Sequence, residues 1–412
     1  MSVRYELSSI KEFNDIIINS NADTKFLKIN DIECRTNDMK YTVVTYDKDM
    51  LATDLIGTYG LLRSVILNCQ NKLVSFAPPK SVSSEQFIRN YSEKTDGVVA
   101  EEFVEGTMIN VFWDPAIGLT GGWEITTRNI PGATSRFFKN CNKSKTFRDM
   151  FLEAASENHL LINLLNPYYC YSFVLQHPEN RIVVPFKKPQ LYLVGVFAIH
   201  QDENDIFVEM HDHQNLKENF EKMNVTVKFP EIYSFNNYAE LIEKYASMNT
   251  PYEKVGVVLH NKKTGERTKI RNPLYEEVRS LRGNQPKLQY QYLHLRKEGK
   301  VREFLNYYPE NKKEFSRFRD QVHLFTDTLF NNYKMCYIKK MKPLKEYPKQ
   351  FTSHMFNIHQ FYLTELREKK EFITSTIVQK YVNDLHPSLL MYCLNYQMRK
   401  RHVDTLNAVS EI

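Results

Sequence analysis

The chain has 412 residues and a formal net charge of +6 at pH 7, from 55 Lys and Arg against 49 Asp and Glu. This length is enough for two or three domains with separate cores, and the modest positive charge permits a nucleic-acid partner without requiring one. No apolar run approaches the roughly 20 residues that span a bilayer, and the polar N-terminal segment has no signal-peptide pattern. We therefore expect an intracellular protein with no membrane association.

The first apolar segments predict strands and a hairpin. Residues 25–34 and 41–47 have strand-like patterns, and residues 63–81 contain two apolar runs around a turn. Arg63 begins this hairpin and Lys80 follows its second run. A plain hairpin with two solvated cations, whose stems lie along apolar surface, is an open alternative to a functional role.

Residues 98–128 predict successive antiparallel strands. Two apolar runs, 98–103 and 107–113, are joined by three residues, and a third run, 123–127, ends in Arg128 and a Pro-Gly turn. Short β-branched and aromatic segments separated by Gly and Pro are typical of such strands.

Lys94-Thr95-Asp96-Gly97 stands just before these strands, after a polar run without strand character. A nucleophilic lysine has to be held at a strand end and largely desolvated, so that its pKa falls and it can attack a phosphate. We therefore favour a surface turn here, with Lys94 as a nucleophile being the alternative.

Two later regions predict a helical segment and another hairpin. Residues 139–166 have apolar positions at helical spacing, which indicates one helix or two. Residues 169–186 predict a hairpin with its turn at 177–180, followed directly by Arg181.

Residues 254–259 and 267–271 predict a further pair of strands. Because side chains alternate between the two faces of a strand, Lys269 and Arg271 share one face. Two like charges on one face have to be solvated or paired. An exposed strand and a phosphate-binding strand both satisfy this requirement.

The residue pattern changes from Tyr275 onward. Aromatic and aliphatic residues recur there at spacings of three and four, separated by charged residues. This spacing is typical of amphipathic helices. We expect a strand-rich domain at 1–278 and a helical domain at 279–412. Cations with interleaved Tyr in the second domain would suit RNA backbone, but we favour a charged solvent face over an aromatic core.

The metal-binding signals are weak. The six cysteines are scattered, and no two have the Cys-x-x-Cys spacing of metal and redox motifs. Met210-His211-Asp212-His213 brings three possible ligands together, but such side chains are common in exposed loops. We therefore predict free thiols and no metal site.

The order of these segments, over roughly residues 25–275, resembles the RNA ligases of the bacteriophage T4 ligase 1 type, in the covalent nucleotidyltransferase superfamily. The resemblance implies an α+β fold, in which an antiparallel-β-rich nucleotidyltransferase (ATP-grasp-like ligase) core precedes an all-helical C-terminal domain. In that family a Lys-x-Asp-Gly turn carries the lysine that accepts AMP. Glu105-Gly106 matches the Asp-Gly, but Phe103 stands at the lysine position.

The sequence differs from the family's pattern at two further positions, where the family has acidic residues. Val174 and Val255 stand where the family has carboxylates that contact ribose and metal. The resemblance implies nucleotide-binding roles for the positions that match the family's motifs: Arg63, Lys80, Phe103, Glu105, Gly106, Arg128, Arg181, Lys269 and Arg271.

We therefore predict an RNA-ligase-like pseudoenzyme that binds nucleotide or RNA ends through a cationic cleft without a cofactor. The first alternative is an active ATP-dependent RNA ligase that uses ATP, Mg²⁺ and a non-standard lysine, Lys94 or another. The second is a structural or interaction protein of a large DNA virus, placed in the host cytoplasm or the virion, because the Phe-for-Lys version looks most like proteins of such viruses.

Overall fold

The structure, a computed structural model, describes residues 3–18, 24–92, 97–136, 144–202, 205–285 and 287–399. It divides into two compact units, Met1–Arg279 and Ser280–Ile412.

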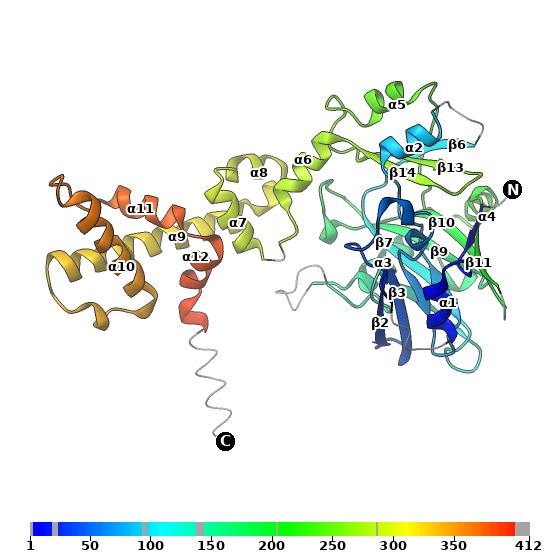
Figure 1. The fold of residues 1–412 in the computed structure, drawn as a ribbon, viewed down its shortest axis with the longest axis horizontal. Coiled ribbons are helices and arrows are strands. Elements are labelled where there is room, and N and C mark those ends of the chain that lie inside the picture. Colours follow the sequence, from blue (N-terminus) through cyan, green and yellow to red (C-terminus); the bar gives the residue numbers. More distant parts are fainter. Residues whose placement is uncertain are drawn as a thin grey trace, which may run out of the picture. The chain divides into compact units, whose positions relative to one another are not determined.

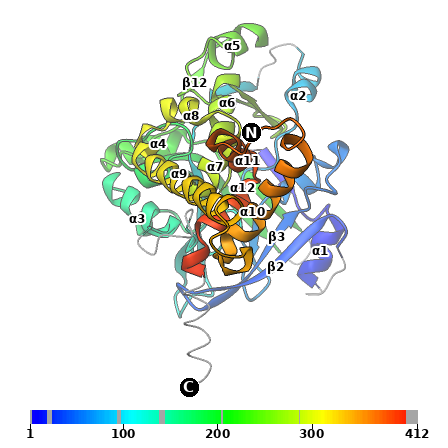
Figure 2. The same ribbon diagram turned by 90° about the vertical axis from the view of Figure 1, so that its left-hand side faces the viewer.

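The first unit contains three antiparallel sheets, drawn in blue to green in Figures 1 and 2. The strands of sheet A, in spatial order, are β1 (Val3–Glu6), β11 (Ile206–Met210), β10 (Gln190–Gln201), β9 (Tyr169–Gln176), β7 (Thr107–Asp114) and β8 (Gly122–Thr126). Those of sheet B are β2 (Leu27–Cys34), β3 (Met39–Tyr46), β4 (Val65–Leu67) and β5 (Leu73–Phe76). Those of sheet C are β12 (Ile232–Tyr233), β6 (Val98–Glu102), β13 (Gly256–Asn261) and β14 (Arg267–Arg271).

Among the described residues, three buried apolar clusters hold these layers together. One lies between sheets A and B and includes Phe13 of α1 (Lys11–Ile18). A second packs α3 (Phe147–Glu157) and α4 (Gln214–Lys222) against sheet A. The third packs α2 (Ser84–Asn90) and α5 (Tyr238–Tyr245) against one face of sheet C, so the other face is left for polar side chains.

The chain passes from one sheet to another at Phe103–Gly106. We expected β6 and β7 to pair, and this is wrong: β6 pairs with β12 and β13, whereas β7 pairs with β8 and β9. Gly106 explains the crossing, because its φ is +147° and a Cβ there would collide with the carbonyl oxygen of Leu175. A left-handed backbone held this close to another strand requires glycine.

The segment around 177–180 also differs from expectation. These residues follow β9 as predicted, but the partner strand is β10, which begins only at Gln190. Pro185 and Pro189 lie in the intervening loop, where they lack the backbone N–H that a strand ladder needs. The helical segment expected at 139–166 contains α3 and a 3₁₀ turn at Ile162–Leu164, while residues 137–143 lie outside the described part.

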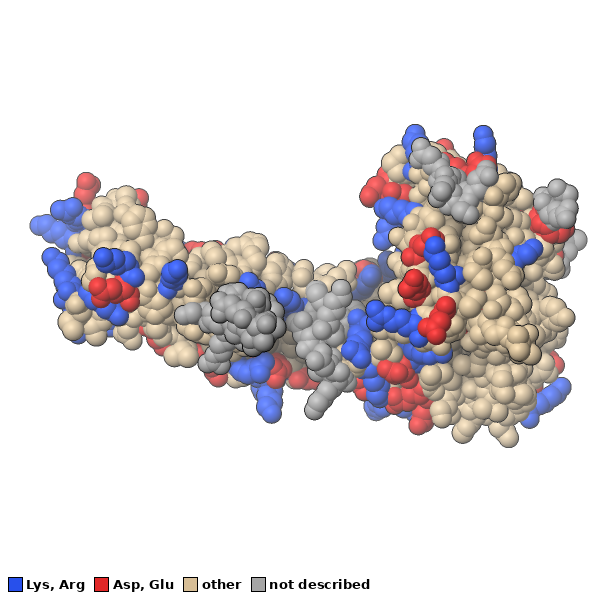
Figure 3. All heavy atoms as spheres, turned by 90° about the horizontal axis from the view of Figure 1, so that it is seen from below, with Lys and Arg blue, Asp and Glu red and all other residues tan. Residues whose placement is uncertain are grey.

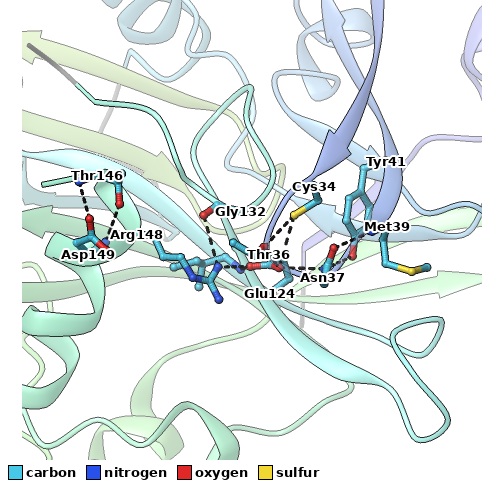
Figure 4. Close-up of polar contacts among 11 residues, drawn as sticks. Cys34, Thr36, Asn37, Met39, Tyr41, Glu124, Gly132, Thr146, Arg148 and Asp149 are labelled. Carbon is cyan, nitrogen blue, oxygen red and sulfur yellow. Dashed lines mark hydrogen bonds and ion pairs between the residues drawn. The ribbon is translucent and has the colours of Figure 1, made fainter. Parts of the chain in front are cut away.

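A buried carboxylate, that of Glu124, connects three elements of the first unit at a site outside sheet C. Glu124 on β8 is 2% exposed and forms an ion pair with Arg148 on α3. Its other oxygen accepts hydrogen bonds from Thr36 Oγ1 at 2.6 Å, Asn37 Nδ2 at 2.9 Å and Cys34 Sγ at 3.6 Å. Figure 4 shows Glu124 between these two groups of donors, so one side chain connects sheet A, the β2–β3 turn and α3.

The second unit is helical in its described residues, as expected for the C-terminal part, and the α+β class is confirmed. Helix α6 (Pro273–Arg282) crosses the division between the units. The helices that follow are α7 (Leu288–Lys297), α8 (Val301–Tyr307), α9 (Lys312–Tyr333), α10 (Lys349–Phe361), α11 (Ser375–Asp384) and α12 (Pro387–Leu394).

Aromatic residues form the core of the helical unit. The Phe304 and Phe315 rings stack at 5.0 Å, and Tyr292 meets Phe315 edge-on at 5.1 Å. On the face drawn in Figure 3, Lys and Arg side chains of this unit lie near Asp and Glu side chains, as on an ordinary solvated surface. A helix both long enough and apolar enough to cross a membrane is absent from the described residues.

Candidate functional site

Three cations lie in a row on one face of β14. Alternation along the strand puts Arg267, Lys269 and Arg271 on the same side. The opposite face belongs to the core: Thr268 Oγ1 donates to the Val82 carbonyl at 2.9 Å, and the neighbouring residue Ile270 packs on the apolar cluster below. From the sequence, we predict only the Lys269 and Arg271 pair. Alternation along the strand places Arg267 on the same face.

Phe103 lies beneath two of these cations. The Nζ of Lys269 is 5.1 Å from the centroid of its ring, and the Cζ of Arg271 is 5.5 Å from it. The backbone explains the proximity, since the Phe103 N–H donates to the Gly256 carbonyl at 3.2 Å and Gly256 pairs with Arg271. The ring of Phe103 therefore lies against cations contributed by β14.

Further cations approach from the segments around sheet B. Residues 77–82 lead from β5 to a parallel bridge between Val82 and Thr268, which brings Lys80 beside β14. Arg63 donates from Nη1 to the Pro78 carbonyl at 3.3 Å, and Arg128 donates from Nε to the Arg63 carbonyl at 3.3 Å. We call this set the cationic cluster: Arg63, Lys80, Arg128, Arg267, Lys269 and Arg271.

The cluster perturbs the ionisation of its own members. Burial and then the charges of four other members, Arg267 first, lower the pKa of Lys269 to about 6. Burial and the charge of Arg63 lower the pKa of Arg267 to about 10. Burial also lowers the pKa of Arg63, with the charge of Arg128 acting in the same direction.

Arg267 is the most buried member and is incompletely paired. It is 8% exposed, and its Nε has no hydrogen-bond partner among the described residues. At the edge of the cluster, Arg271 Nε is 3.1 Å from the carboxylate of Glu276 on α6. Buried cations are costly unless an anion accompanies them, so the interior of the cluster is suited to receiving one.

Glu105, from the crossing between β6 and β7, and Arg181, from the loop after β9, form a second group. Glu105 is 6% exposed, and its carboxylate accepts the Val183 N–H at 2.7 Å and the Val184 N–H at 3.1 Å. Burial raises its pKa to about 7, although these N–H groups and the charge of Arg181 act against that. Arg181 Nε donates to the Val183 carbonyl at 2.9 Å. Glu105 therefore anchors the loop, a role that the sequence alone did not indicate.

The two positions of the expected acids are buried and apolar. Val174 is 7% exposed within β9, and Val255, just before β13, is 5% exposed. Among the described residues, no group of three or more His, Cys, Asp or Glu side chains is arranged to hold a metal ion. The residues present thus do not fit a metal held by the family's two acids. Lys94 lies outside the described residues.

A cavity of about 1190 Å³ adjoins the cationic cluster between sheets A and C. Phe103 and Gly256 line it, so the cavity and the cluster meet at this ring. Tyr192 on β10 and His260 on β13 contribute to opposite walls. Burial lowers the pKa of His260 to about 3, so this imidazole is neutral at pH 7. Sequence reasoning missed the cavity, since strands distant in the chain form its walls.

Two viral proteins are similar to the chain in sequence. An RNA ligase of Rhodothermus phage RM378 is 25% identical over 288 residues, covering 63% of this chain and 64% of the phage protein. An immediate-early protein ICP-46 homolog of Invertebrate iridescent virus 6 is 24% identical over 336 residues, covering 75% and 69%. The match thus spans slightly less than two thirds of the phage ligase. These relatives support an RNA-ligase-like nucleotidyltransferase family.

Known protein-family models give no match. Among solved structures, an archaeal ATP-dependent RNA ligase has a TM-score of 0.37 and 11% identity, covering 70% of this chain and 72% of that one. An RNA ligase of Naegleria gruberi, solved with ATP and Mn, has a TM-score of 0.35 and 13% identity, covering 50% and 59%. Similarity this loose carries no argument about function.

Proposed function

We propose that this chain is a divergent relative of the bacteriophage T4 ligase 1 type that binds the phosphates of a nucleotide or of an RNA end at the cationic cluster. The proposal depends on one observation. The three cations of β14 (Arg267, Lys269 and Arg271) lie near Arg63 and Lys80, and a cavity between two sheets lies beside them. The established chemistry of the family's lysine is lost at position 103, because a phenyl ring has no lone pair with which to form a phosphoramidate.

The electrostatics of the cluster favour a polyanion. Burial first, and then the charges of other cluster members, lower the pKa values of Arg63, Arg267 and Lys269, so the charged form of each is disfavoured in the free protein. A bound phosphate would stabilise the charged guanidinium groups of Arg63 and Arg267, because its negative charge offsets the penalty of burial and of repulsion by neighbouring cations. It would also give the unpaired Nε of Arg267 an acceptor.

The cavity offers a place for the rest of the ligand. Its volume of about 1190 Å³ exceeds the 300–1,000 Å³ or so of ordinary ligand sites. Phe103 borders both the cavity and the cluster, so a ligand with phosphates on the cations would extend past this ring. A base and ribose of a nucleotide, or the last nucleoside of an RNA, would lie in this cavity, where Phe103 and Tyr192 offer aromatic surface.

The relative from an iridescent virus supports a viral setting and keeps an interaction protein as the second candidate. Such a protein would have a vestigial cluster and would show no specific binding of phosphates. The two functions therefore differ in a direct measurement of binding.

The test is equilibrium binding of ATP and of a 5′-phosphorylated RNA oligonucleotide to the full-length protein. We expect Arg63→Ala to weaken binding by about tenfold, the usual loss when a charge-assisted hydrogen bond is removed. Arg35→Ala removes an equal charge from an exposed turn and should leave binding unchanged. Absent binding, salt-insensitive binding or equal losses in both variants would refute the proposal.

A further inference from the structure

The amine of Lys269 lies where the family's nucleophile would be expected. Its Nζ is 5.1 Å from the centroid of Phe103, the residue that occupies the lysine position. We propose that Lys269 takes over the missing role and accepts a nucleotidyl group from a nucleoside triphosphate. This inference rests on the proposed function, because the triphosphate must first bind at the cationic cluster.

The position of Lys269 suits a nucleophile. It is in the middle of β14, where it pairs with Val258 of β13, and its side chain is partly buried. Its stem is therefore held by a strand within a sheet. The amine reaches toward Phe103 from two strands away, beside Gly256, which carries no side chain that would separate them.

The same surroundings keep the amine reactive. An ordinary lysine has a pKa above 10 and is protonated at pH 7, so it has no free electron pair. Burial, together with the cations around it, lowers the pKa of Lys269 to about 6. The neutral, nucleophilic amine is then the main form at neutral pH.

Charged groups near this amine come from sheet C, from the segments beside sheet B and from α6. The carboxylate of Glu101, on the same face of sheet C, is paired with Lys262 at 2.9 Å, and that of Glu276, on α6, is paired with Arg271 at 3.1 Å. Both acids thus have cationic partners of their own. The cations whose charge acts on Lys269 are Arg267, Arg63, Arg271 and Lys80.

The reaction balances with the triphosphate as the co-reactant. The lone pair of Nζ attacks the α-phosphorus, a P–N bond forms, and the bond from the α-phosphorus to its bridging oxygen breaks. Pyrophosphate leaves with that electron pair, and the amine proton passes to water. Arg63, Lys80 and Arg267 stabilise the negative charge that develops on the phosphates.

A simpler role for Lys269 is to hold a phosphate as a cation. In that role the bound anion would raise the pKa of Lys269, and the amine would take up a proton instead of reacting. The two roles give different products, because only a nucleophile becomes covalently labelled.

The experiment incubates the full-length protein with α-³²P-labelled ATP or GTP and Mg²⁺, followed by a denaturing gel. We expect a label that is stable in alkali and labile in acid, as a phosphoramidate is, and peptide mapping should locate it on Lys269. Lys269→Arg should lose the label, whereas Lys94→Arg and the exposed-lysine control Lys40→Arg should keep it. Labelling should rise between pH 5 and 7 and then level off, whereas an ordinary lysine would continue to gain to about pH 10.

Binding of the same nucleotide is measured in parallel by equilibrium dialysis, so the two proposals fail separately. Bound nucleotide with no covalent label, or a label mapped to Lys94 or to any other residue, overturns the role of Lys269 and leaves the proposed function standing. Absence of binding by the wild-type protein overturns both. Mapping in the wild-type protein does not depend on whether a variant folds.

Discussion

Arg271 Nε lies 3.1 Å from the carboxylate of Glu276, and the same carboxylate is 3.2 Å from Arg279 Nη1. The first turn of α6 therefore supplies an acid to the edge of the cationic cluster. This acid competes with any phosphate for Arg271, so its removal is informative.

We predict that Glu276→Gln strengthens binding of ATP and of 5′-phosphorylated RNA. An exposed ion pair contributes about 0.2–1 kcal/mol, which corresponds to a gain in affinity of roughly 1.4- to 5-fold once Arg271 is released. The effect should be largest at low salt. Glu314→Gln removes the partner of Arg317 at 2.6 Å in the helical unit and is the matched control. Equal changes in both variants, or weaker binding in Glu276→Gln, would contradict this role.

A second prediction concerns the pH dependence of stability. The pKa of Lys269 is about 6 in the folded protein and near 10.5, the ordinary value of a lysine, when the chain is unfolded. Between these values the unfolded state binds more protons, so this group makes the folded state less stable as pH falls toward 6. Lys269→Met removes the amine and keeps an unbranched stem against Phe103.

The melting temperature of Lys269→Met should therefore exceed that of the wild-type protein, by roughly 2–4 °C for each kcal/mol relieved. The difference should widen from pH 8 to pH 6. Thermal unfolding followed by circular dichroism checks this, with Lys40→Met at an exposed site as the control. A constant difference across that range would mean that the amine does not titrate differently in the folded state.

Local patterns in the sequence predicted the pair of cations on β14 and the helical unit, because both depend on residues that are close together in the chain. Alternation along five residues places Lys269 and Arg271 together, and three- and four-residue spacing indicates the helices. Arg267 follows from the same alternation and was overlooked.

The rest depends on contacts between distant segments. Nothing near Val98–Glu102 in the chain indicates that this strand pairs with Gly256–Asn261, more than 150 residues away. The same holds for Glu105, whose partners are N–H groups at Val183 and Val184. Hence the sequence indicated a pair of cations on one strand, but not the cavity or the buried carboxyl beside them.

A third prediction addresses the crossing between sheets. Gly106→Ala should destabilise the first unit by about 3 kcal/mol or more. The φ of +147° is unfavourable for alanine, and the new Cβ would collide with a backbone oxygen. Gly57→Ala is the control, because a Cβ there would meet nothing within 4 Å. Chemical denaturation of both variants provides the comparison, and a Gly106→Ala protein as stable as Gly57→Ala would contradict the explanation of the crossing.

A fourth prediction concerns the buried carboxylate in Figure 4. Glu124→Gln leaves Arg148 without its anion and should cost about 3 kcal/mol of unfolding free energy, as breaking other buried pairs does. Asp31→Asn removes the partner of Lys40 on an exposed strand and should stay near wild type. Urea denaturation measures both, and similar small effects would show that the Glu124 contacts contribute little.

The last prediction places an amine at position 103, where the proposed relationship to the ligases expects the lysine. If Lys269 and position 103 reach the same point, then adding Phe103→Lys to the Lys269→Met protein should restore the covalent label that Lys269→Met alone loses. This double variant has the same number of lysines at the cationic cluster as the wild-type protein. The new lysine starts from the backbone next to Gly256 and lies near Arg271. Burial among Arg267, Arg63 and Lys80 would lower its pKa for the same physical reason. Peptide mapping should then find the label at position 103. A double variant that binds nucleotide but stays unlabelled would show that the two positions are not interchangeable, and that Phe103 does more than fill the space of a lost lysine.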